Sequence, residues 1–451
     1  MVRCWRCGES AAGFSTASCS GNGAMTIALI DANAFYVSCE LLFQPWLRGR
    51  AAVAASNNDG CVVSRNDEAK RLGIKMGTPV FELRELVRRG EVTVFSSNYE
   101  LYQSLSNRVM AILQEQAPRV FVYSIDEAFV DLAGVSDPEG WSRMIQQQIL
   151  RSVGLPVGVG IGPTKTLAKL ANWAAKRWKS RTGCVVDLRD PGRQEKLLRY
   201  APAGEVWGIG PRLSKRLAED LKIDTAWQLA SADPKHLRRH FNVNVERTAR
   251  ELLGTACFPF QDAGPERKQM IISSRSFGNK VHALEDLQEA VAGFVSTAAG
   301  KLRSQGSLAN CIQVFAKTSP FSAGEQYSGS RILAMPYPAD DTRDLLRAAL
   351  TGLKALYRPG YAYAKAGVIL SQFAERGTIT GDLFAPRPRP NSERLMAVMD
   401  AINLREGRGT VRFARERPVG AWSMKRELLT PAYTTSWQGL AKVSCQPARS
   451  A

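Results

Sequence analysis

The chain has 451 residues, 45% of them hydrophobic, so it is long enough for several buried cores and we expect more than one domain. Its 60 Lys and Arg residues exceed its 42 Asp and Glu residues by 18 charges, which favours a polyanionic partner, nucleic acid first, over an acidic small substrate. No run of 18 apolar residues could span a bilayer, and nine cysteines without framework spacing indicate reduced thiols, so we expect a soluble, cytoplasmic protein with no membrane partner.

The first 24 residues lack the apolar core of a secretory signal. Cys4 and Cys7 have the spacing of half a metal site, but Cys19 is their one near neighbour, so a structural zinc site would be incomplete. Met25 begins an apolar run that predicts a strand. We therefore interpret residues 1–24 as an N-terminal extension, which is disordered or precedes the true start codon.

An acidic pair follows one predicted strand and precedes another. Short apolar runs alternate with helical stretches from Met25 to about Leu188, which predicts an α/β or α+β layer. The runs Val120–Tyr123 and Ala128–Leu132 enclose Asp126 and Glu127, and Asp31 ends an earlier run; Val157–Ile161 predicts another strand. Adjacent carboxylates repel each other and are costly to bury, so the pattern indicates a cation, and oxygen ligands suit magnesium. The alternative is a solvated turn.

The next stretch of the chain contains basic residues and no acidic ones. Between Gly140 and Val186 there are eight Lys or Arg residues and no acid, which favours contact with phosphate over a merely solvated helix face. The cations of its second half are Lys165, Lys169, Lys176, Arg177, Lys179 and Arg181. Gly208 and Gly210 then precede an amphipathic helix predicted over Leu213–Leu221. A glycine turn of this kind could present N–H groups to a DNA phosphate, although such turns also simply join two packed helices.

The second half of the chain predicts a separate α/β domain. Strands are expected around Ile271–Phe277 and Gln313–Thr318, and a helix over Leu287–Leu302, after a polar linker at residues 261–268. Three prolines mark a second linker before residue 391. The tail from residue 391 holds ten Lys or Arg residues against five acids and is interpreted as a partly ordered basic appendage.

Several motifs occur together in one order. They are Asp31–Tyr36, Ser124–Ala128, the Gly-Ile-Gly turn and Ser274–Gly278. With them the chain resembles the Y-family translesion DNA polymerases. It is most similar to the UmuC type, the catalytic subunit of bacterial DNA polymerase V, through Ser56–Gly60, Ser96–Glu100, Lys317–Phe321 and Asn403–Gly409. The resemblance extends from about Met25 to Lys442.

This resemblance implies a multidomain α+β fold, the right-hand polymerase. The expected parts are a palm at 25–188 with fingers inserted at about 44–98, a helical thumb with a helix-hairpin-helix at 189–262, a little finger at 269–375, a linker at 376–390 and a basic UmuC-type C-terminal region at 391–451.

The resemblance also implies site residues. Asp31, Asp126 and Glu127, with the backbone carbonyl of Ala32, would hold two Mg²⁺ ions for phosphoryl transfer. Nucleotide contacts would come from Tyr36, Ser64, Lys70 and Lys176, and DNA contacts from Lys165, Lys169, Gly208, Gly210 and Arg275. Tyr36 occupies the steric-gate position, where an aromatic ring would clash with a ribose 2′-hydroxyl; its alternative role is core packing. Other branches often place tyrosine at Asp67 and arginine at Lys70.

The implied activity is error-prone, template-directed DNA synthesis past lesions in the SOS response. Primer–template DNA and deoxynucleoside triphosphates would be the substrates, near the nucleoid, with a processed UmuD-type dimer, RecA and the sliding clamp as partners. Only Leu383 and Phe384 remain of the clamp-binding pentapeptide. The alternatives are a noncatalytic DNA-binding recruitment protein of the same family and a metal-dependent repair nuclease.

Overall fold

The computed structural model describes residues 25–260, 267–322, 324–377, 386, 388–407, 409–417, 422–437 and 440. The extension at 1–24 and the clamp residues Leu383 and Phe384 lie outside the described residues. The chain divides into two compact units. Unit 1 holds the described residues up to 33 and 108–260, and unit 2 holds 34–107 and the described residues after 260. Within the described ranges, no helix is both long and apolar enough to cross a membrane.

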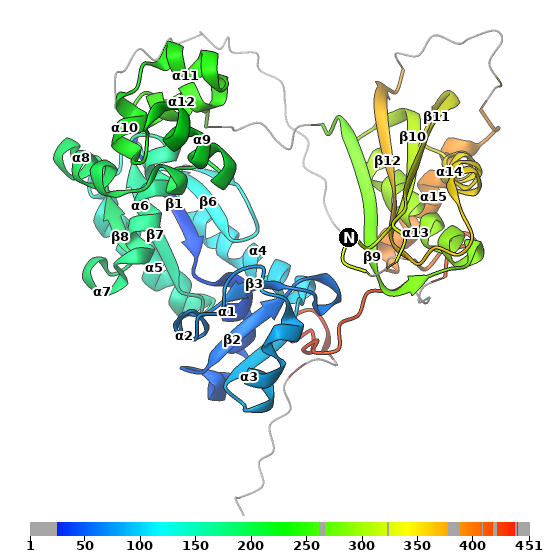
Figure 1. The fold of residues 1–451 in the computed structure, drawn as a ribbon, viewed down its shortest axis with the longest axis horizontal. Helices are drawn as coiled ribbons and strands as arrows, with labels where there is room; N and C mark the ends of the chain where they lie inside the picture. The colour runs from blue at the N-terminus through cyan, green and yellow to red at the C-terminus, as the bar shows by residue number, and fades with distance from the viewer. Residues whose placement is uncertain are drawn as a thin grey trace, which may run out of the picture. The chain divides into compact units, whose positions relative to one another are not determined.

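Unit 1 is built on a five-stranded sheet in the order β5-β6-β1-β7-β8 (Figure 1). Its strands are β1 (Ile27–Ala32), β5 (Arg119–Val122), β6 (Glu127–Asp131), β7 (Val157–Gly162) and β8 (Val185–Asp187). The central strand β1 pairs antiparallel with both β6 and β7 and is buried along its whole length. The predicted strands of this region are therefore confirmed within one or two residues.

Helices cover this sheet and continue beyond it. They are α5 (Pro138–Ser152), α6 (Lys165–Arg177), α7 (Lys179–Thr182), α8 (Pro191–Tyr200), α9 (Pro211–Leu221), α10 (Ala226–Ser231), α11 (Pro234–His240) and α12 (Val243–Leu252), with a short 3-10 turn at Ala203–Glu205. Helix α6 packs against β7 and β1, and its leucines join one apolar cluster with α8 to α12. The amphipathic helix expected over Leu213–Leu221 is confirmed as α9.

Glu251 joins α12 to the beginning of α6. Its fully buried carboxylate accepts hydrogen bonds from the backbone N of Thr166 at 2.9 Å and the Thr166 hydroxyl at 2.7 Å. The backbone N–H groups of Cys257 and Phe258 donate to its other oxygen, at 3.0 and 2.9 Å. Since a buried carboxylate is costly without donors, these four bonds stabilise the helical layer on α6.

Unit 2 contains two sheets. The first has the order β3-β2-β4, with β2 (Ala51–Ala55), β3 (Val62–Arg65) and β4 (Val92–Ser96). Around it lie α1 (Phe35–Leu42), α2 (Asp67–Arg71), α3 (Arg84–Arg88) and 3-10 turns at Pro45–Leu47, Asn57–Asp59 and Val80–Leu83. Helix α4 (Tyr99–Gln116) runs across the boundary between the units.

The second sheet of unit 2 is antiparallel, in the order β11-β10-β12-β9. Its strands are β9 (Met270–Val281), β10 (Ser307–Thr318), β11 (Ser328–Ala339) and β12 (Tyr363–Glu375). Helices α13 (Leu284–Ser304) and α14 (Thr342–Leu356) pack together against it, and α15 (Ser392–Arg405) follows. The strands and helix expected in this region are confirmed.

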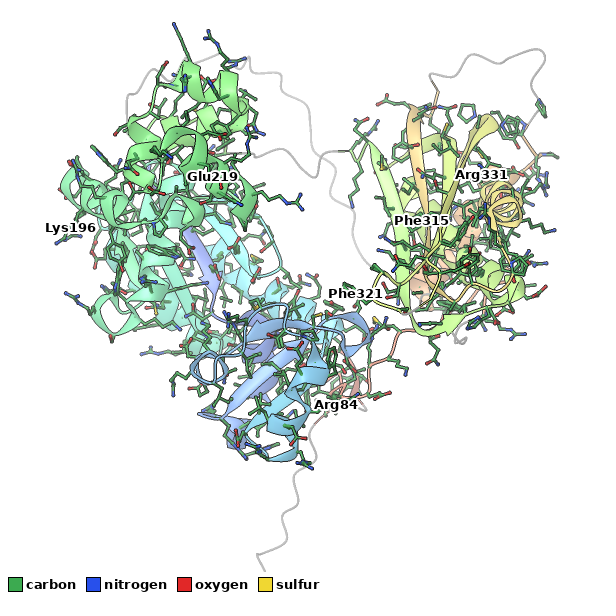
Figure 2. The ribbon with its side chains drawn as sticks, viewed as in Figure 1. Arg84, Lys196, Glu219, Phe315, Phe321 and Arg331 are labelled. Carbon is green, nitrogen blue, oxygen red and sulfur yellow. The ribbon has the colours of Figure 1, made fainter. Side chains whose placement is uncertain are left out.

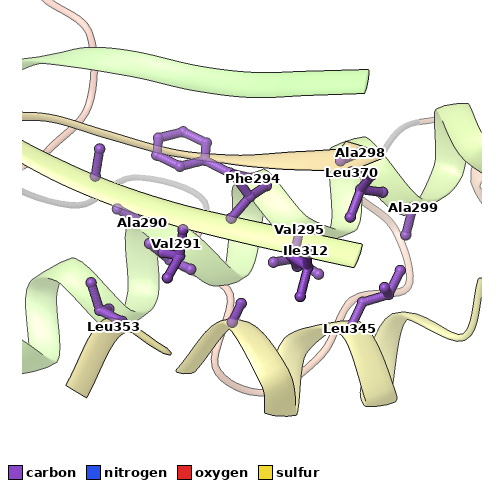
Figure 3. Close-up of a cluster of buried hydrophobic side chains, with 14 of the residues drawn as sticks. Ala290, Val291, Phe294, Val295, Ala298, Ala299, Ile312, Leu345, Leu353 and Leu370 are labelled. Atoms are coloured by element: carbon purple, nitrogen blue, oxygen red, sulfur yellow. The ribbon is translucent and has the colours of Figure 1, made fainter. Parts of the chain in front are cut away.

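The core of this layer comes from the spacing of apolar residues along α13. Val291 and Val295 are one helical turn apart and belong to one buried cluster with Ile312 of the sheet and Leu345 of α14; Figure 3 shows Val295 beside Ile312. All four are fully buried. In contrast, the Lys317–Phe321 motif leaves the sheet as a turn in which Phe321 is 96% exposed (Figure 2). The α+β multidomain class predicted from the sequence is confirmed.

Candidate active site

Two of the three predicted acids meet on neighbouring strands. Asp31 of β1 lies directly opposite Glu127, the first residue of β6, in the antiparallel ladder. The backbone N of Ala32 donates to the carbonyl oxygen of Asp126 at 3.0 Å and so extends the pairing by one step. The sheet thereby fixes Asp31 and Glu127 as cross-strand neighbours.

Ser124 holds the acidic turn in shape. Its hydroxyl donates to Asp126 Oδ1 at 2.5 Å and accepts from the backbone N of Asp126 at 3.3 Å and of Glu127 at 3.1 Å. The backbone N–H groups of Tyr123 and Ser124 both donate to the Glu127 carbonyl oxygen at 3.0 Å. A short hydroxyl side chain is well suited to this local bonding, which explains the serine in the motif.

One face of α6 supplies cations and an amide to the acids. Lys176 Nζ forms an ion pair with Asp31 Oδ1, and Lys169 Nζ lies 3.0 Å from Glu127 Oε2. Between them, Asn172 Nδ2 donates to Asp31 Oδ2 at 3.0 Å. The helical period places these three residues on one side of the helix. The sequence analysis assigned Lys169 to DNA and Lys176 to the nucleotide and did not identify Asn172, whose partner Asp31 lies 141 positions away in the chain.

Burial dominates the electrostatics of Asp31. Burial, with a smaller contribution from the Glu127 carboxylate, outweighs the lowering effect of Lys176 and raises the pKa of this carboxyl to about 6. Asn172 Oδ1 is also buried and has no hydrogen-bond partner. A hard cation would relieve the repulsion of these two acids, and their oxygen donors are the type that magnesium takes, so the residues fit the predicted metal.

The described residues do not include three acid, histidine or cysteine side chains already gathered around one point that could hold a metal ion. Instead, the Asp126 carboxylate bonds to Ser124, and the two lysines neutralise Asp31 and Glu127. The structure thus brings together Asp31 and Glu127, while Asp126 stands beside them in the turn. Ala32 pairs with Val157 of β7 at the end of β1.

The basic residues predicted to touch DNA differ in exposure. Lys165 is buried: its ammonium donates to the Pro259 carbonyl oxygen at 2.6 Å and lies 4.4 Å from the ring centre of Phe121. Burial lowers the pKa of Lys165. These contacts argue against Lys165 as a DNA contact. Lys169 lies over the rings of Tyr123 and Trp207, at 4.5 and 5.4 Å.

The glycine turn has one position that requires glycine. Gly208 has a φ of +89°, whereas Gly210 is extended and caps α9 without a side-chain bond. Space around Gly210 is open, so its role there is not steric. Arg275 lies exposed on β9.

The predicted nucleotide contacts of α1 to α2 lie in unit 2. Tyr36 stacks on Tyr102 with ring centres 4.5 Å apart and an interplanar angle of 12°. Ser64 is buried and accepts from the backbone N of Val37 at 3.5 Å. Lys70 lies exposed and pairs with Asp67 at 2.8 Å. Asp67, one of the departures from other branches, therefore engages Lys70 directly.

Comparison with known proteins gives the family. A model of the impB/mucB/samB family matches residues 30–173, and its C-terminal domain matches 268–383. The protein UmuC of Salmonella typhimurium is 47% identical over 421 residues, which cover 92% of this chain and 99% of that protein. This chain belongs to the impB/mucB/samB family. Residues 393–443 of this family member match a further domain of unknown function.

Other relatives extend the comparison. The protein SamB of Salmonella typhimurium is 47% identical over 416 residues, covering 91% of this chain and 97% of that protein. DNA polymerase IV of Moorella thermoacetica is 30% identical over 397 residues, covering 85% and 94%. A solved Y-family DNA polymerase chimera has a TM-score of 0.61 at 20% identity, with 78% of this chain and 100% of that chain covered. The UmuC-type resemblance and the Y-family polymerase fold are confirmed.

Proposed function

We propose that Asp31, Asp126 and Glu127 form the centre at which this chain adds deoxynucleotides to a primer. The chain is an error-prone translesion DNA polymerase of the UmuC type, and DNA and deoxynucleoside triphosphates are its substrates. The observation that supports the proposed centre best is the cross-strand pair of the buried Asp31 and the partly buried Glu127, in which burial raises the pKa of Asp31.

The chain's own residues divide the work. Two Mg²⁺ ions held by the three acids and the Ala32 carbonyl would ease deprotonation of the primer 3′-hydroxyl and neutralise charge on the triphosphate. Ser124 orients Asp126, and Asn172 holds the Asp31 carboxylate in place. Before substrates bind, Lys169 neutralises Glu127 and Lys176 neutralises Asp31. When the triphosphate binds, the Lys176 ammonium contacts it instead.

The remaining assignments follow the family pattern. Tyr36 acts as the steric gate and Ser64 and Lys70 contact the triphosphate, while Lys169, Gly208, Gly210 and Arg275 contact DNA. We assign the palm to 25–188 with fingers at about 44–98, the thumb to 189–262, the little finger to 269–375, the linker to 376–390 and the basic region to 391–451. A processed UmuD-type dimer and RecA are its partners at nucleoid DNA in the cytoplasm, and Leu383 and Phe384 contact the sliding clamp.

The proposal is tested by primer extension on undamaged and abasic templates. The assay compares the wild type with Asp126→Ala/Glu127→Ala, with magnesium, four deoxynucleotides, a RecA filament and a UmuD-type dimer. The control variant Glu219→Ala/Asp220→Ala removes an exposed adjacent acid pair on α9, of which Glu219 is labelled in Figure 2. Extension should be lost in the first variant and kept in the control. Equal inactivity of all three proteins would favour a recruitment role, and primer shortening would indicate a nuclease.

A further inference from the structure

Residues 422–437, here called the C-terminal strap, belong to the part of the chain that matches a domain of unknown function. The strap begins on the second sheet layer of unit 2. There the ring of Trp422 contacts Phe294 of α13, with centres 5.9 Å apart. A Cβ on Gly278 would lie 3.1 Å from the backbone N of Lys425, so β9 and the strap pass close to each other.

Asn58, in the 3-10 turn between β2 and β3, bonds to both the strap and β9. Its Oδ1 accepts from the backbone N of Lys425 at 3.0 Å. Its Nδ2 donates to the carbonyl oxygens of Ser276 and Phe277 at 3.0 and 3.2 Å. Next to it, Asp59 Oδ2 accepts from the backbone N of Glu427 at 3.0 Å. One asparagine side chain thus bonds the strap and β9 together.

The strap then pairs with the end of β4. The backbone N of Ser96 donates to the Leu428 carbonyl oxygen at 3.1 Å, and the backbone N of Leu428 donates to Ser96 Oγ at 3.0 Å. The buried Asn98 Nδ2 lies 3.0 Å from Thr430 Oγ1 and 3.2 Å from the Thr430 carbonyl oxygen. These hydrogen bonds fix the position of Thr430 against β4 and Asn98.

Thr430 reaches a buried acid. Its hydroxyl donates to Glu40 Oε2 at 2.8 Å, while the Tyr102 hydroxyl donates to Glu40 Oε1 at 2.7 Å. Glu40 and Tyr102 are both fully buried. Burial raises the pKa of Glu40, and the two hydroxyl donors lower it. One of the two donors that compensate for this burial therefore comes from the strap.

Tyr102 is also the ring on which Tyr36 stacks, at 4.5 Å. A continuous chain of contacts therefore runs from Thr430 through Glu40 and Tyr102 to the ring that the family pattern makes the sugar gate. We propose that the C-terminal strap positions this gate: Thr430 fixes Glu40, Glu40 fixes Tyr102, and Tyr102 sets the ring of Tyr36 against the nucleotide sugar. This inference rests on the proposed role of Tyr36.

The variant that tests the inference is Thr430→Val, which keeps the shape of the side chain and removes the hydroxyl. Thr430→Ser restores the donor. The matched control is Thr434→Val, because Thr434 is also on the strap but donates to Ser104, at 2.9 Å, and not to Glu40. The measured quantity is the ratio of kcat/KM for a deoxynucleotide to that for the matching ribonucleotide, with the full chain and its partners.

We expect Thr430→Val to lower this ratio roughly tenfold, as suits the loss of one hydrogen bond to a charged group. Thr430→Ser and Thr434→Val should remain near the wild type. If Tyr36→Ala lowers the ratio but Thr430→Val leaves it unchanged, the strap inference is overturned while the gate stands. If Tyr36→Ala itself leaves the ratio unchanged, the assigned gate is wrong. If Thr430→Val and Thr434→Val lose rate equally and the ratio does not change, the strap stabilises the fold but does not position the gate, and the inference is overturned.

A second measurement does not depend on activity. Hydrogen exchange of the full-length wild type and Thr430→Val should show faster exchange in α1 and in residues 99–107 of the variant, since Glu40 and Tyr102 lose an anchor. Thr434→Val should leave the exchange of α1 unchanged. Unchanged exchange of α1 in Thr430→Val would contradict the inference.

Discussion

Replacing Gly160 with alanine should displace α6 from the sheet. A Cβ at this position of β7 would lie 2.8 Å from the carbonyl carbon of Ala171, and nearer still to Ala168 O and Asn172 N. Carbon atoms pack at about 3.5–4.0 Å, so the helix has to move by roughly 1 Å. The opposing atoms are backbone atoms of α6, which cannot turn away as a flexible side chain would.

The size of the effect follows from this geometry. Overpacking costs typically about 1–3 kcal/mol, and rigid opposing atoms favour the upper end, about 3 kcal/mol. For a unit of this size that corresponds to a fall in Tm of about 6–12 °C. The same movement shifts Asn172 and Lys176 away from Asp31, and a misplacement of about 1 Å can lower a catalytic rate roughly 100-fold.

Thermal unfolding by circular dichroism and primer extension measure the two effects. The control is Gly300→Ala in α13, where no atom lies within 4 Å of the added Cβ and alanine favours the helix. This variant should be as stable as the wild type, or up to about 1 kcal/mol more stable, and fully active. A Gly160→Ala protein with unchanged Tm and unchanged extension would refute the argument that β7 needs glycine to seat α6.

Three further predictions concern buried acids and metal. Glu251→Ala leaves four donors without their acceptor and should destabilise the chain by about 3 kcal/mol; a Tm within about 2 °C of the wild type would contradict this. Because the folded-state pKa of Glu40 is raised, its contribution to stability is full below its ordinary value of 4.5 and is lost as pH rises through the folded value. The Tm of Glu40→Gln should therefore depend less on pH above 4.5 than the Tm of the wild type. Equal slopes of Tm against pH in the two proteins would contradict this prediction. Mg²⁺ at 100 times its Kd should stabilise the wild type by about 2.7 kcal/mol and should stabilise Asp31→Asn much less. A wild-type Tm that does not change when Mg²⁺ is added would show that the folded chain does not bind it.

The sequence predicted those features that depend on local spacing. The short apolar runs on either side of Asp126 and Glu127 predicted the strands β5 and β6, and the pattern over Leu287–Leu302 predicted the helix α13. Partners far apart in the chain leave no such signal. The bond from Asn172 to Asp31 spans 141 positions and that from Thr430 to Glu40 spans 390, so neither follows from a spacing rule.

Charge alone was also insufficient to separate surface from core. The basic stretch predicted phosphate contact, and Lys165 was named among the DNA contacts, but the Lys165 ammonium lies against the ring of Phe121 and donates to a backbone carbonyl. A lysine stem is apolar and its charge can be satisfied by one acceptor and aromatic faces. The composition of a segment therefore predicts the kind of partner that it binds, but it does not predict which residues of the segment contact that partner.

Single-nucleotide incorporation opposite an abasic site tests the central claim most directly. The wild type, Asp31→Asn and the control Glu219→Ala/Asp220→Ala are compared with magnesium and the partner proteins present. A carboxylate-dependent polymerase predicts that Asp31→Asn loses more than about 100-fold in rate while the control does not change. Incorporation by Asp31→Asn at the wild-type rate would contradict the assignment of this centre.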